Sequence, residues 1–364
     1  MKAAVLYELN KPLVIEDVTL DPPKAGEVRV KVAAAGVCRS DLHFMKGEAV
    51  IAVPAVLGHE GSAVVAEVGP GVTRVAPGDH VILSFVPYCG HCRSCLTGRA
   101  NLCDTHLATG ASMFDGTRRL HGAGGKELAH MGKVACFAEE AIVPETGCIK
   151  IDPSFPLPQA ALIGCSVTTG VGSVLFNAKP DPGCSAVVIG CGGVGLNVLQ
   201  GLRLAGASTI IAVDVNDAAL EFAGRFGATH TINARAEDVV KRVKEITGGG
   251  ADYGFEAYGG GETSVQAFDS VRKGGTAVIV GLAPMQERIP IDPVALVRQE
   301  KTLKGSYYGT ARPSLDFHKM VDLYTQGRLD VDGLITRTYS LDQINEAYEE
   351  LDRGVVGRGI IDFS

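Results

Sequence analysis

Four cysteines lie close together between residues 89 and 103, with the spacing C-x2-C-x2-C-x7-C; they are Cys89, Cys92, Cys95 and Cys103. Four thiolates can close a tetrahedron around Zn²⁺ and leave no open position, which is typical of a structural zinc site. The first three spacings also suit an iron–sulfur cluster, so the spacing alone leaves the metal open. The cluster predicts a lobe of chain wrapped around a metal rather than four unrelated buried cysteines.

A second set of metal-binding residue types, Cys38, His59 and Cys165, is spread more widely along the chain. Cys38 and His59 stand at expected strand–turn junctions, and Cys165 precedes a glycine-rich half of the sequence. Two sulfurs and one imidazole would leave a fourth tetrahedral position for water or substrate, as catalytic zinc sites do. The spacing also allows two buried apolar cysteines and a core histidine.

A glycine motif follows these candidates: residues 190–195 read G-C-G-G-V-G and fit the dinucleotide-binding fingerprint G-x-G-x-x-G. Gly190 would permit the tight turn, Gly192 would let a pyrophosphate approach the backbone, and Gly195 would let helix and strand pack closely. Gly193 and Val194 open the helix, whose N-terminus offers free N–H groups to phosphate. The alternative is a glycine turn in an α/β domain that binds no nucleotide.

Asp214 ends the next expected strand, 19 residues after Gly195. A carboxylate there is placed to accept hydrogen bonds from an adenosine ribose and would repel a 2′-phosphate. No Arg or Lys follows in the segment VNDAA. The motif therefore favours NAD over NADP, unless Asp214 is only a solvated residue at a strand end.

Two kinds of elements must position these residues. Residues 1 to about 105 contain alternating apolar runs between Pro-Gly and Gly-Pro turns, which predict a mainly antiparallel β domain. From about 106 to 135 periodicity is lost, and we expect a long surface loop. From about 184 strands alternate with helices, which predicts an α/β domain with a doubly wound parallel sheet.

Composition excludes several classes of protein. The net charge of −7 and the lack of any Lys/Arg run argue against a nucleic-acid partner. No uninterrupted apolar run approaches the length of a membrane span, and the N-terminal residues read as a strand rather than a signal peptide. We therefore expect a cytoplasmic protein whose ten cysteines serve metal chemistry rather than disulfides.

Several motifs occur in a fixed order: GVCRSDLH at 36–43, GHE at 58–60, the four-cysteine lobe, IGCSVTTG at 163–170 and GCGGVG at 190–195. With these motifs the chain resembles, over essentially its whole length, the zinc-containing alcohol dehydrogenases of the medium-chain dehydrogenase/reductase superfamily. The resemblance implies a GroES-like catalytic domain at 1–166 and 308–364, and a Rossmann-type NAD-binding domain at 167–307. It also implies two zinc ions per subunit, one catalytic and one structural.

The resemblance implies a role for each residue near the metal. Cys38, His59 and Cys165 would hold the catalytic zinc, and Asp41 would orient His59 unless it only caps a turn. Glu60 would lie behind the metal and could exchange as a ligand, or serve only in a salt bridge. Positions that match the family's substrate channel are Phe85, Phe137 and Leu282, although each could simply belong to the core.

The resemblance also implies a proton path. Zinc would lower the pKa of the alcohol, whose proton would leave through Ser40, the nicotinamide ribose and His43, while hydride passes to the nicotinamide. A surface histidine is the alternative for His43. Arg39 and Arg358 match arginines that neutralise the cofactor pyrophosphate.

Departures from the family pattern bear on specificity. Ala219 stands where the family often carries a lysine, which could weaken contacts to the adenosine ribose. The 106–135 segment is long, as in the class that oxidises thiol–formaldehyde adducts, yet His43 stands where the glutathione-dependent class usually has tyrosine. Cys165 disfavours a polyol dehydrogenase, since such relatives commonly carry glutamate there.

The sequence thus predicts a dehydrogenase that moves hydride between a primary or secondary alcohol, or its aldehyde or ketone, and NAD. A thiol-dependent formaldehyde dehydrogenase is the enzymatic alternative. The other is a zinc-stabilised nucleotide-binding scaffold without catalysis, against which the intact ligand and relay set argues. Strands expected near 278–282 and 303–309 resemble those that join subunits in this family, so we expect a homodimer, with a homotetramer as the alternative.

Overall fold

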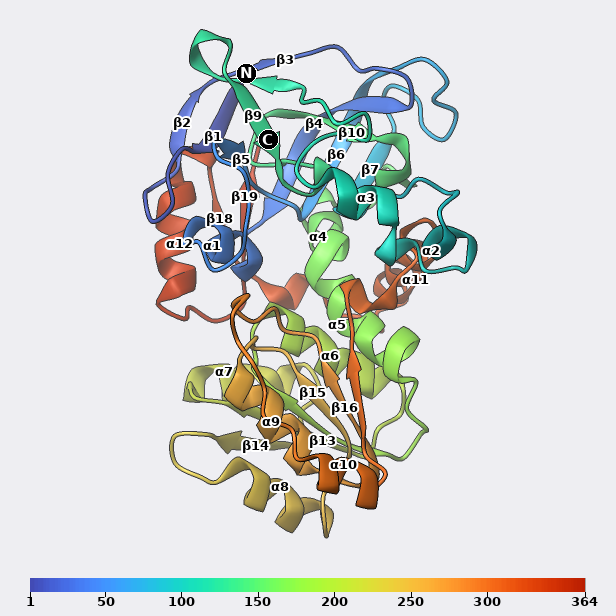
Figure 1. Ribbon diagram of the computed structural model, residues 1–364, viewed down its shortest axis with the longest axis vertical. Coiled ribbons are helices and arrows are strands. Elements are labelled where there is room, and N and C mark those ends of the chain that lie inside the picture. Colours follow the sequence, from blue (N-terminus) through green and yellow to red (C-terminus); the bar gives the residue numbers. More distant parts are fainter. Residues whose placement is uncertain (364) are drawn as a thin grey trace. The chain divides into compact units, whose positions relative to one another are not determined.

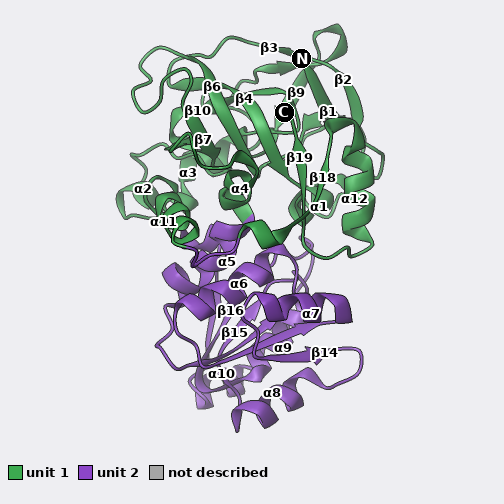
Figure 2. Ribbon diagram, turned by 180° about the vertical axis from the view of Figure 1, so that it is seen from behind, with its two compact units in different colours: residues 1–165, 312–326, 331–364 green, residues 166–311, 327–330 purple. Residues whose placement is uncertain are grey.

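The computed structural model describes residues 1–363, which fold into two compact units (Figure 2). Unit 1 contains residues 1–165, 312–326 and 331 onward, and unit 2 contains residues 166–311 and 327–330. The chain therefore leaves unit 1, builds most of unit 2, returns to unit 1, and contributes residues 327–330 to unit 2 before it completes unit 1.

Unit 1 is built on two mainly antiparallel sheets (Figure 1). The first sheet has the strand order β2 (Val14–Asp17), β1 (Lys2–Leu6), β5 (Ala55–Val56), β9 (Glu127–His130), β8 (Leu120–His121), β3 (Thr19–Leu20). The second has the order β11 (Cys148–Ile151), β7 (His80–Leu83), β6 (Gly61–Val68), β4 (Glu27–Gly36), β19 (Arg358–Asp362), β18 (Ile335–Tyr339). Strand β10 (Glu140–Pro144) pairs with the first half of β4, and β19 pairs with its last residues.

The long strand β4 organises unit 1 because its apolar residues alternate with polar ones, as expected for a strand buried on one face. Val28, Val30 and Val32 are buried, whereas Lys31 between them is exposed. The chain leaves β4 at Val37 and Cys38 and turns directly into α1. The helices of unit 1 are α1 (Arg39–Met45), α2 (Arg93–Leu96), α3 (Asp104–Thr109), α4 (Leu157–Leu162), α11 (Pro313–Thr325) and α12 (Ile344–Asp352).

The prediction of a long surface loop at 106–135 is wrong. This segment contains the end of α3 together with β8 and β9, and β9 joins the first sheet by parallel pairing with β5. Arg119 and His130 within it are completely buried. Arg119 donates to the Glu27 carboxylate at 2.6 and 2.9 Å, so an ion pair fixes the segment to the start of β4.

Unit 2 is an α/β unit around an all-parallel sheet, as expected. Its strand order is β14 (His230–Asn233), β13 (Thr209–Asp214), β12 (Ser185–Ile189), β15 (Ala251–Glu256), β16 (Val271–Ile279), β17 (Thr302–Gly305). Counted along the chain this is 3-2-1-4-5-6, the doubly wound order of dinucleotide-binding folds. The helices are α5 (Thr168–Gly172), α6 (Gly193–Leu204), α7 (Asp217–Arg225), α8 (Val239–Thr247), α9 (Gly261–Ser270) and α10 (Pro293–Arg298).

Side chains at the helix ends explain why the helices of unit 2 start where they do. Asn216 accepts a hydrogen bond from the Ala218 N–H and caps α7, while Asp238 accepts from the Lys241 N–H and caps α8. Gly248 ends α8 with a left-handed backbone, at a φ of 70°. One helical stretch of the described chain, Leu157–Ala178, has the length and apolar composition of a membrane span, but 78% of its most apolar window is buried inside the protein. Such burial is typical of a core helix.

Candidate active site

Cys38, His59 and Cys165 converge in unit 1 from three separate elements. Cys38 precedes α1, His59 lies between β5 and β6, and Cys165 lies in a π-helical turn, Ile163–Val167, that follows α4. All three are at least 95% buried, and their ligand atoms lie within 4.8 Å of one another. The Cys165 Sγ is 3.3 Å from the His59 Nε2. The structure thus brings together residues that are more than a hundred positions apart in sequence.

The electrostatics of this group suit a bound cation. A hydrogen bond from the Cys165 thiol, together with the charges of His59 and Arg358, lowers the pKa of Cys38 well below its usual value. The same hydrogen bond, with burial, raises the pKa of Cys165. The two sulfurs compete for one proton in a buried space, and a soft divalent cation would replace that proton. Two thiolates and one imidazole fit Zn²⁺ and leave its fourth position open.

Asp41 fixes the ring of His59. Its Oδ1 accepts hydrogen bonds from the His59 Nδ1 at 3.2 Å and from the Gly58 N–H at 3.0 Å, and its side chain is completely buried. With Nδ1 occupied, Nε2 is the nitrogen left to face the two sulfurs. This is the orientation expected of a carboxylate–histidine–metal arrangement.

Glu60 and Arg358 form a buried ion pair next to these ligands. Burial would lower the pKa of the Arg358 guanidinium, but the charges of Glu60, Cys38 and Cys165 raise it above its usual range. Gly36 makes room for the pair, because a Cβ at this position would lie 2.6 Å from the Glu60 Cδ. Arg39, by contrast, is half exposed and lies 3.8 Å from the Asp352 carboxylate.

Ser40 and His43 lie on α1, immediately after Cys38. The Cys38 thiol donates to the Ser40 hydroxyl at 3.8 Å. The His43 Nδ1 is hydrogen-bonded to the Glu48 carboxylate, and the His43 side chain is 12% exposed. A hydroxyl beside the ligands and an imidazole close to solvent are thus on one short helix.

The four cysteines of the 89–103 segment also form a compact group, with ligand atoms within 4.8 Å of one another. Backbone N–H groups point at the sulfurs: Cys89 donates to the Cys103 Sγ at 3.3 Å, and Cys92 donates to the Cys89 Sγ at 3.4 Å. Partial burial raises the pKa of Cys89, but hydrogen bonds from the Thr105 hydroxyl and the His91 and Cys92 N–H groups outweigh it and lower this pKa to about 6. Burial raises the pKa of Cys95 to about 12 and also raises that of Cys103, so these two sulfurs hold protons that a metal would replace, and the four sulfurs suit a closed metal site.

In unit 2 the glycine motif forms the turn between β12 and α6. Gly190 has a φ of +96°, which other residues rarely adopt. A Cβ at Gly195 would lie 1.8 Å from the Gly190 carbonyl oxygen, so the helix approaches the turn as closely as backbone allows. A Cβ at Gly192 would meet nothing within 4 Å, which leaves open space over the N-terminus of α6. Such space suits a phosphate group.

Asp214 lies at the end of β13, beside this turn. Its carboxylate accepts hydrogen bonds from the backbone N–H groups of Cys191 at 2.8 Å, Val215 at 2.8 Å and Asn216 at 3.0 Å. The carboxylate is therefore fixed next to the glycine turn, where a nucleotide ribose is bound in folds of this type.

Comparison with known proteins places this geometry in a family. The family model described as an alcohol dehydrogenase GroES-like domain matches residues 24–153, and the model described as a zinc-binding dehydrogenase matches residues 193–326. The S-(hydroxymethyl)glutathione dehydrogenase of Paracoccus denitrificans is 41% identical over 371 residues, which cover 99% of each chain. The chain belongs to the zinc-containing alcohol dehydrogenases.

Two further relatives show the range of this similarity. The NDMA-dependent alcohol dehydrogenase of Amycolatopsis methanolica is 42% identical over 99% of this chain and 98% of its own. The crystal structure of benzyl alcohol dehydrogenase from Acinetobacter calcoaceticus has a TM-score of 0.95 and 33% identity, covering 100% of this chain and 99% of that one. The chain is therefore a zinc-dependent oxidoreductase that acts on small molecules, with NAD as the typical cofactor of its family.

The three residues expected in the substrate channel of this alcohol dehydrogenase differ in burial and in surroundings. Phe85 is partly buried and packs edge-on against His59, with ring centroids 5.0 Å apart. Leu282 lies in unit 2 and is 51% exposed. Phe137 is completely buried within the core of unit 1 and packs edge-on against Tyr348, so its place in the substrate channel stays a prediction. Apolar type alone did not distinguish a channel wall from the core.

Sequence reasoning also missed two residues of the dehydrogenase site. Glu48 binds His43, and Tyr348 on α12 is buried close enough for the charges of Asp41 and Cys38, added to burial, to raise its pKa. Glu48 is five residues from His43 and could have been considered as its partner. The sequence does not single out Tyr348, since an aromatic residue in an amphipathic helix is usually a core residue.

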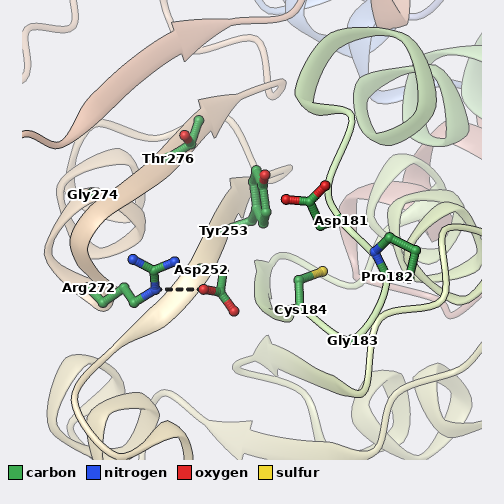
Figure 3. Close-up of a pocket in the computed structure, with 9 residues that line it drawn as sticks. All are labelled: Asp181, Pro182, Gly183, Cys184, Asp252, Tyr253, Arg272, Gly274 and Thr276. Atoms are coloured by element: carbon green, nitrogen blue, oxygen red, sulfur yellow. Dashed lines mark hydrogen bonds and ion pairs between the residues drawn. The ribbon is translucent and has the colours of Figure 1, made fainter.

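A separate pocket in unit 2 of the dehydrogenase lies at the amino ends of β12, β15 and β16, with a volume of about 290 Å³ (Figure 3). Two of its charged groups pair with each other: Arg272 donates to the Asp252 carboxylate at 2.6 Å, and the Ser185 N–H and hydroxyl each donate to Asp252 at 2.8 Å. The glycine turn, in contrast, lies at the carboxyl ends of the strands, where folds of this type bind their ligands.

Proposed function

We propose that this alcohol dehydrogenase oxidises primary or secondary alcohols, or reduces the corresponding aldehydes or ketones, at a zinc held by Cys38, His59 and Cys165. The observation that supports this proposal is the buried convergence of exactly these three ligand atoms within 4.8 Å, with Asp41 fixing the histidine ring. A second zinc held by Cys89, Cys92, Cys95 and Cys103 would be structural.

When bound, the zinc supplies Lewis acidity, which lowers the pKa of a hydroxyl group in its open position. Asp41 keeps His59 in place, and Arg358 pairs with the Glu60 carboxylate next to the ligands. Ser40 accepts the hydroxyl proton next to Cys38 as it gives up its own, and His43 is the group that releases a proton to solvent. Glu48, bound to the His43 Nδ1, fixes the orientation of the imidazole ring.

We propose NAD as the hydride acceptor, bound by Gly190, Gly192, Gly193, Val194 and Gly195. Asp214 favours NAD over NADP because its fixed carboxylate would lie against a 2′-phosphate. Arg39 and Arg358 would neutralise the pyrophosphate, although Arg358 already pairs with Glu60 and would have to serve both anions. We assign the catalytic role to residues 1–166 and 308–364, and NAD binding to residues 167–307.

A second candidate function has direct support among the relatives. The Paracoccus denitrificans protein is named for a glutathione adduct of formaldehyde, and it is 41% identical to this chain. We therefore retain a thiol-dependent formaldehyde dehydrogenase as the alternative. The intact ligand sets support either enzyme over an inactive scaffold.

We also propose a cytoplasmic homodimer. Seven large apolar side chains of unit 2 are more than 40% exposed, and five of them fall in the stretch of chain that runs from the end of β16 through α10 to just beyond the outer strand β17: Leu282, Met285, Val294, Val297 and Tyr307. Apolar side chains gathered beside the edge of a sheet are typical of an interface between copies.

Turnover of an alcohol panel tests the proposed function. Purified enzyme is assayed with aliphatic and aromatic alcohols plus NAD or NADP, and with formaldehyde in the presence and absence of low-molecular-weight thiols. NDMA, on which one relative depends according to its name, forms a further arm. We expect alcohol-dependent NAD reduction that Cys165→Ala abolishes. Formaldehyde turnover that requires a thiol would favour the alternative, and alcohol turnover by metal-free protein would refute zinc catalysis.

A further inference from the structure

A lysine is buried beside the four-cysteine lobe. Lys133 ends the short 3-10 turn Met131–Lys133, and its side chain is completely buried. Its Nζ donates hydrogen bonds to the carbonyl oxygens of His106 at 3.1 Å and Gly110 at 2.8 Å. The Phe114 ring covers another side of the ammonium, at 5.6 Å from the ring centroid.

Lys133 lacks a carboxylate to balance its charge among the described residues. Its hydrogen-bond acceptors are neutral carbonyls; burial lowers the pKa of Lys133 to about 8, and the charge of Cys103 opposes this shift. An ammonium removed from water is unfavourable unless a nearby anion compensates its charge. The uncharged state of His106 is consistent with a cation nearby, because burial and the charge of Lys133 lower the pKa of that histidine to about 3.

Helix α3 connects the lysine to the lobe. The helix starts immediately after Cys103, which is its N-cap residue, and both carbonyls that bind Lys133 belong to this helix or to the glycine that follows it. A metal ligand and the acceptors of a buried ammonium thus lie within one short, rigid piece of chain.

The lobe supplies the missing anion once it holds its metal. Four thiolates around Zn²⁺ carry a net charge of about −2. Arg93 and Arg99 lie in the lobe itself but are exposed, so solvent screens their charges. Lys133 is the cation that is shielded from water.

We propose that Lys133 is the counter-charge of the zinc-loaded four-cysteine lobe and strengthens the lobe's hold on zinc. This inference concerns the proposed structural zinc and is independent of the proposed substrate. The interaction is reciprocal: the metal-thiolate anion stabilises the buried ammonium, and the ammonium stabilises the anion. Charged groups behind metal ligands typically change metal affinity by about 10- to 100-fold.

Zinc release tests this role. Holoenzymes with Lys133→Met, which keeps length but removes charge, and Lys133→Arg, which keeps charge, are mixed with a chromogenic zinc chelator. A Cys38→Ser background is used in parallel, so that the release phase that persists belongs to the four-cysteine lobe. We expect about 10- to 100-fold weaker zinc retention in Lys133→Met and substantial retention in Lys133→Arg. Lys126→Met is the control, since Lys126 lies in the same segment but is exposed.

Thermal unfolding with and without chelator separates charge balance from packing. If Lys133 serves the metal site, Lys133→Met should destabilise the zinc-loaded protein more than the chelated protein. An equal loss of stability in both states would show that Lys133 only ties down the end of α3, and would overturn the proposal. Unchanged zinc retention in Lys133→Met, or an equal loss in Lys126→Met, would overturn it as well.

Discussion

Asp41 combines two tasks in one carboxylate oxygen, which receives both the His59 ring and the Gly58 N–H. The backbone hydrogen bond fixes the turn before His59, and the side-chain hydrogen bond fixes the ring itself. Asp41 therefore determines where the imidazole lies even though it does not belong to the proposed ligand set. This explains physically why a fully buried carboxylate stands next to a metal site.

Replacement of this carboxylate tests the arrangement at the residue scale. Asp41→Asn keeps an acceptor oxygen but removes the negative charge that raises the basicity of His59. We expect the proposed catalytic site to lose zinc affinity by about 10- to 100-fold, measured by metal competition with a chelator. Glu67→Gln, an exposed carboxylate of the same unit, should leave the affinity unchanged. Equal affinities in the two variants would contradict a positioning role for Asp41.

At the same scale, sequence reasoning selected the residue types that the structure brings together, but not their partners. Cys38, His59 and Cys165 could be proposed because soft ligands are rare enough to stand out. Tyr348 and the pairing of Arg358 with Glu60 could not, since contacts between distant segments leave no local pattern. Phe137 shows the same limit, because its apolar side chain fits a channel or a core equally well.

At the scale of elements, the glycine turn was the most predictable feature, and its reason is steric. Gly195 lies where a Cβ would be 1.8 Å from the Gly190 carbonyl oxygen, so any side chain would push α6 away from β12. The start of α6 would then shift from the position that receives the cofactor phosphates.

Gly195→Ala should therefore weaken NAD binding by at least about tenfold, since loss of one or two phosphate hydrogen bonds costs roughly 1.5–3 kcal/mol each. Titration of NAD by calorimetry measures this. Gly224→Ala is the matched control, because Gly224 is also helical, a Cβ there meets nothing within 4 Å, and alanine favours helix. Its NAD affinity should be unchanged, and a similar loss in both variants would contradict the steric argument.

The 106–135 segment was the least predictable element. Its buried side chains include Arg119, His130 and Lys133, so hydrophobic periodicity does not report its burial. Their polar groups find partners that periodicity does not reveal: Arg119 pairs with Glu27 and Asp115, and the His130 Nε2 accepts from the N–H groups of Arg119 and Leu120. A prediction based on the spacing of apolar residues therefore assigns such a segment to a surface loop.

The burial of His130 predicts a pH dependence of stability. Burial, together with the positive charge of Arg119, lowers the pKa of His130 to about 3, whereas in the unfolded chain it is about 6.5. Below pH 6.5 the unfolded state binds more protons than the folded state, so the free energy of unfolding decreases as the pH decreases. From pH 7 to 5.5 we expect a loss of roughly 1 kcal/mol from this group.

Urea unfolding at these two pH values measures the effect. His130→Gln keeps an acceptor for the two backbone N–H groups but cannot titrate, so its stability should fall by about 1 kcal/mol less between pH 7 and 5.5. His318→Gln replaces an exposed histidine and should follow the parent enzyme. An unchanged pH dependence in His130→Gln would show that His130 does not stay neutral in the folded state.

At the scale of the whole molecule, the sheet of unit 2 ends in β17, a short outer strand beside the exposed apolar side chains of α10. An open edge next to apolar surface favours aggregation unless another chain covers it. Val297 on α10 is the most exposed of these side chains, at 73%. This surface is where the proposed dimer would form.

Val297→Glu should therefore weaken the proposed dimer, because burying an unpaired carboxylate in an apolar interface costs more than the valine contacts contributed. We expect the dimer dissociation constant to rise by at least about tenfold, equivalent to 1.4 kcal/mol, in sedimentation equilibrium. Leu315→Glu places the same charge at a 57% exposed apolar position of α11 in unit 1 and should leave the dimer intact. Dissociation by both variants would indicate general damage, and a monomeric parent enzyme would refute the dimer itself. If only Val297→Glu dissociates the dimer, the surface formed by α10 and β17 is the interface. Dimer formation would then cover the β17 edge of the parallel sheet, beside which the exposed apolar side chains lie.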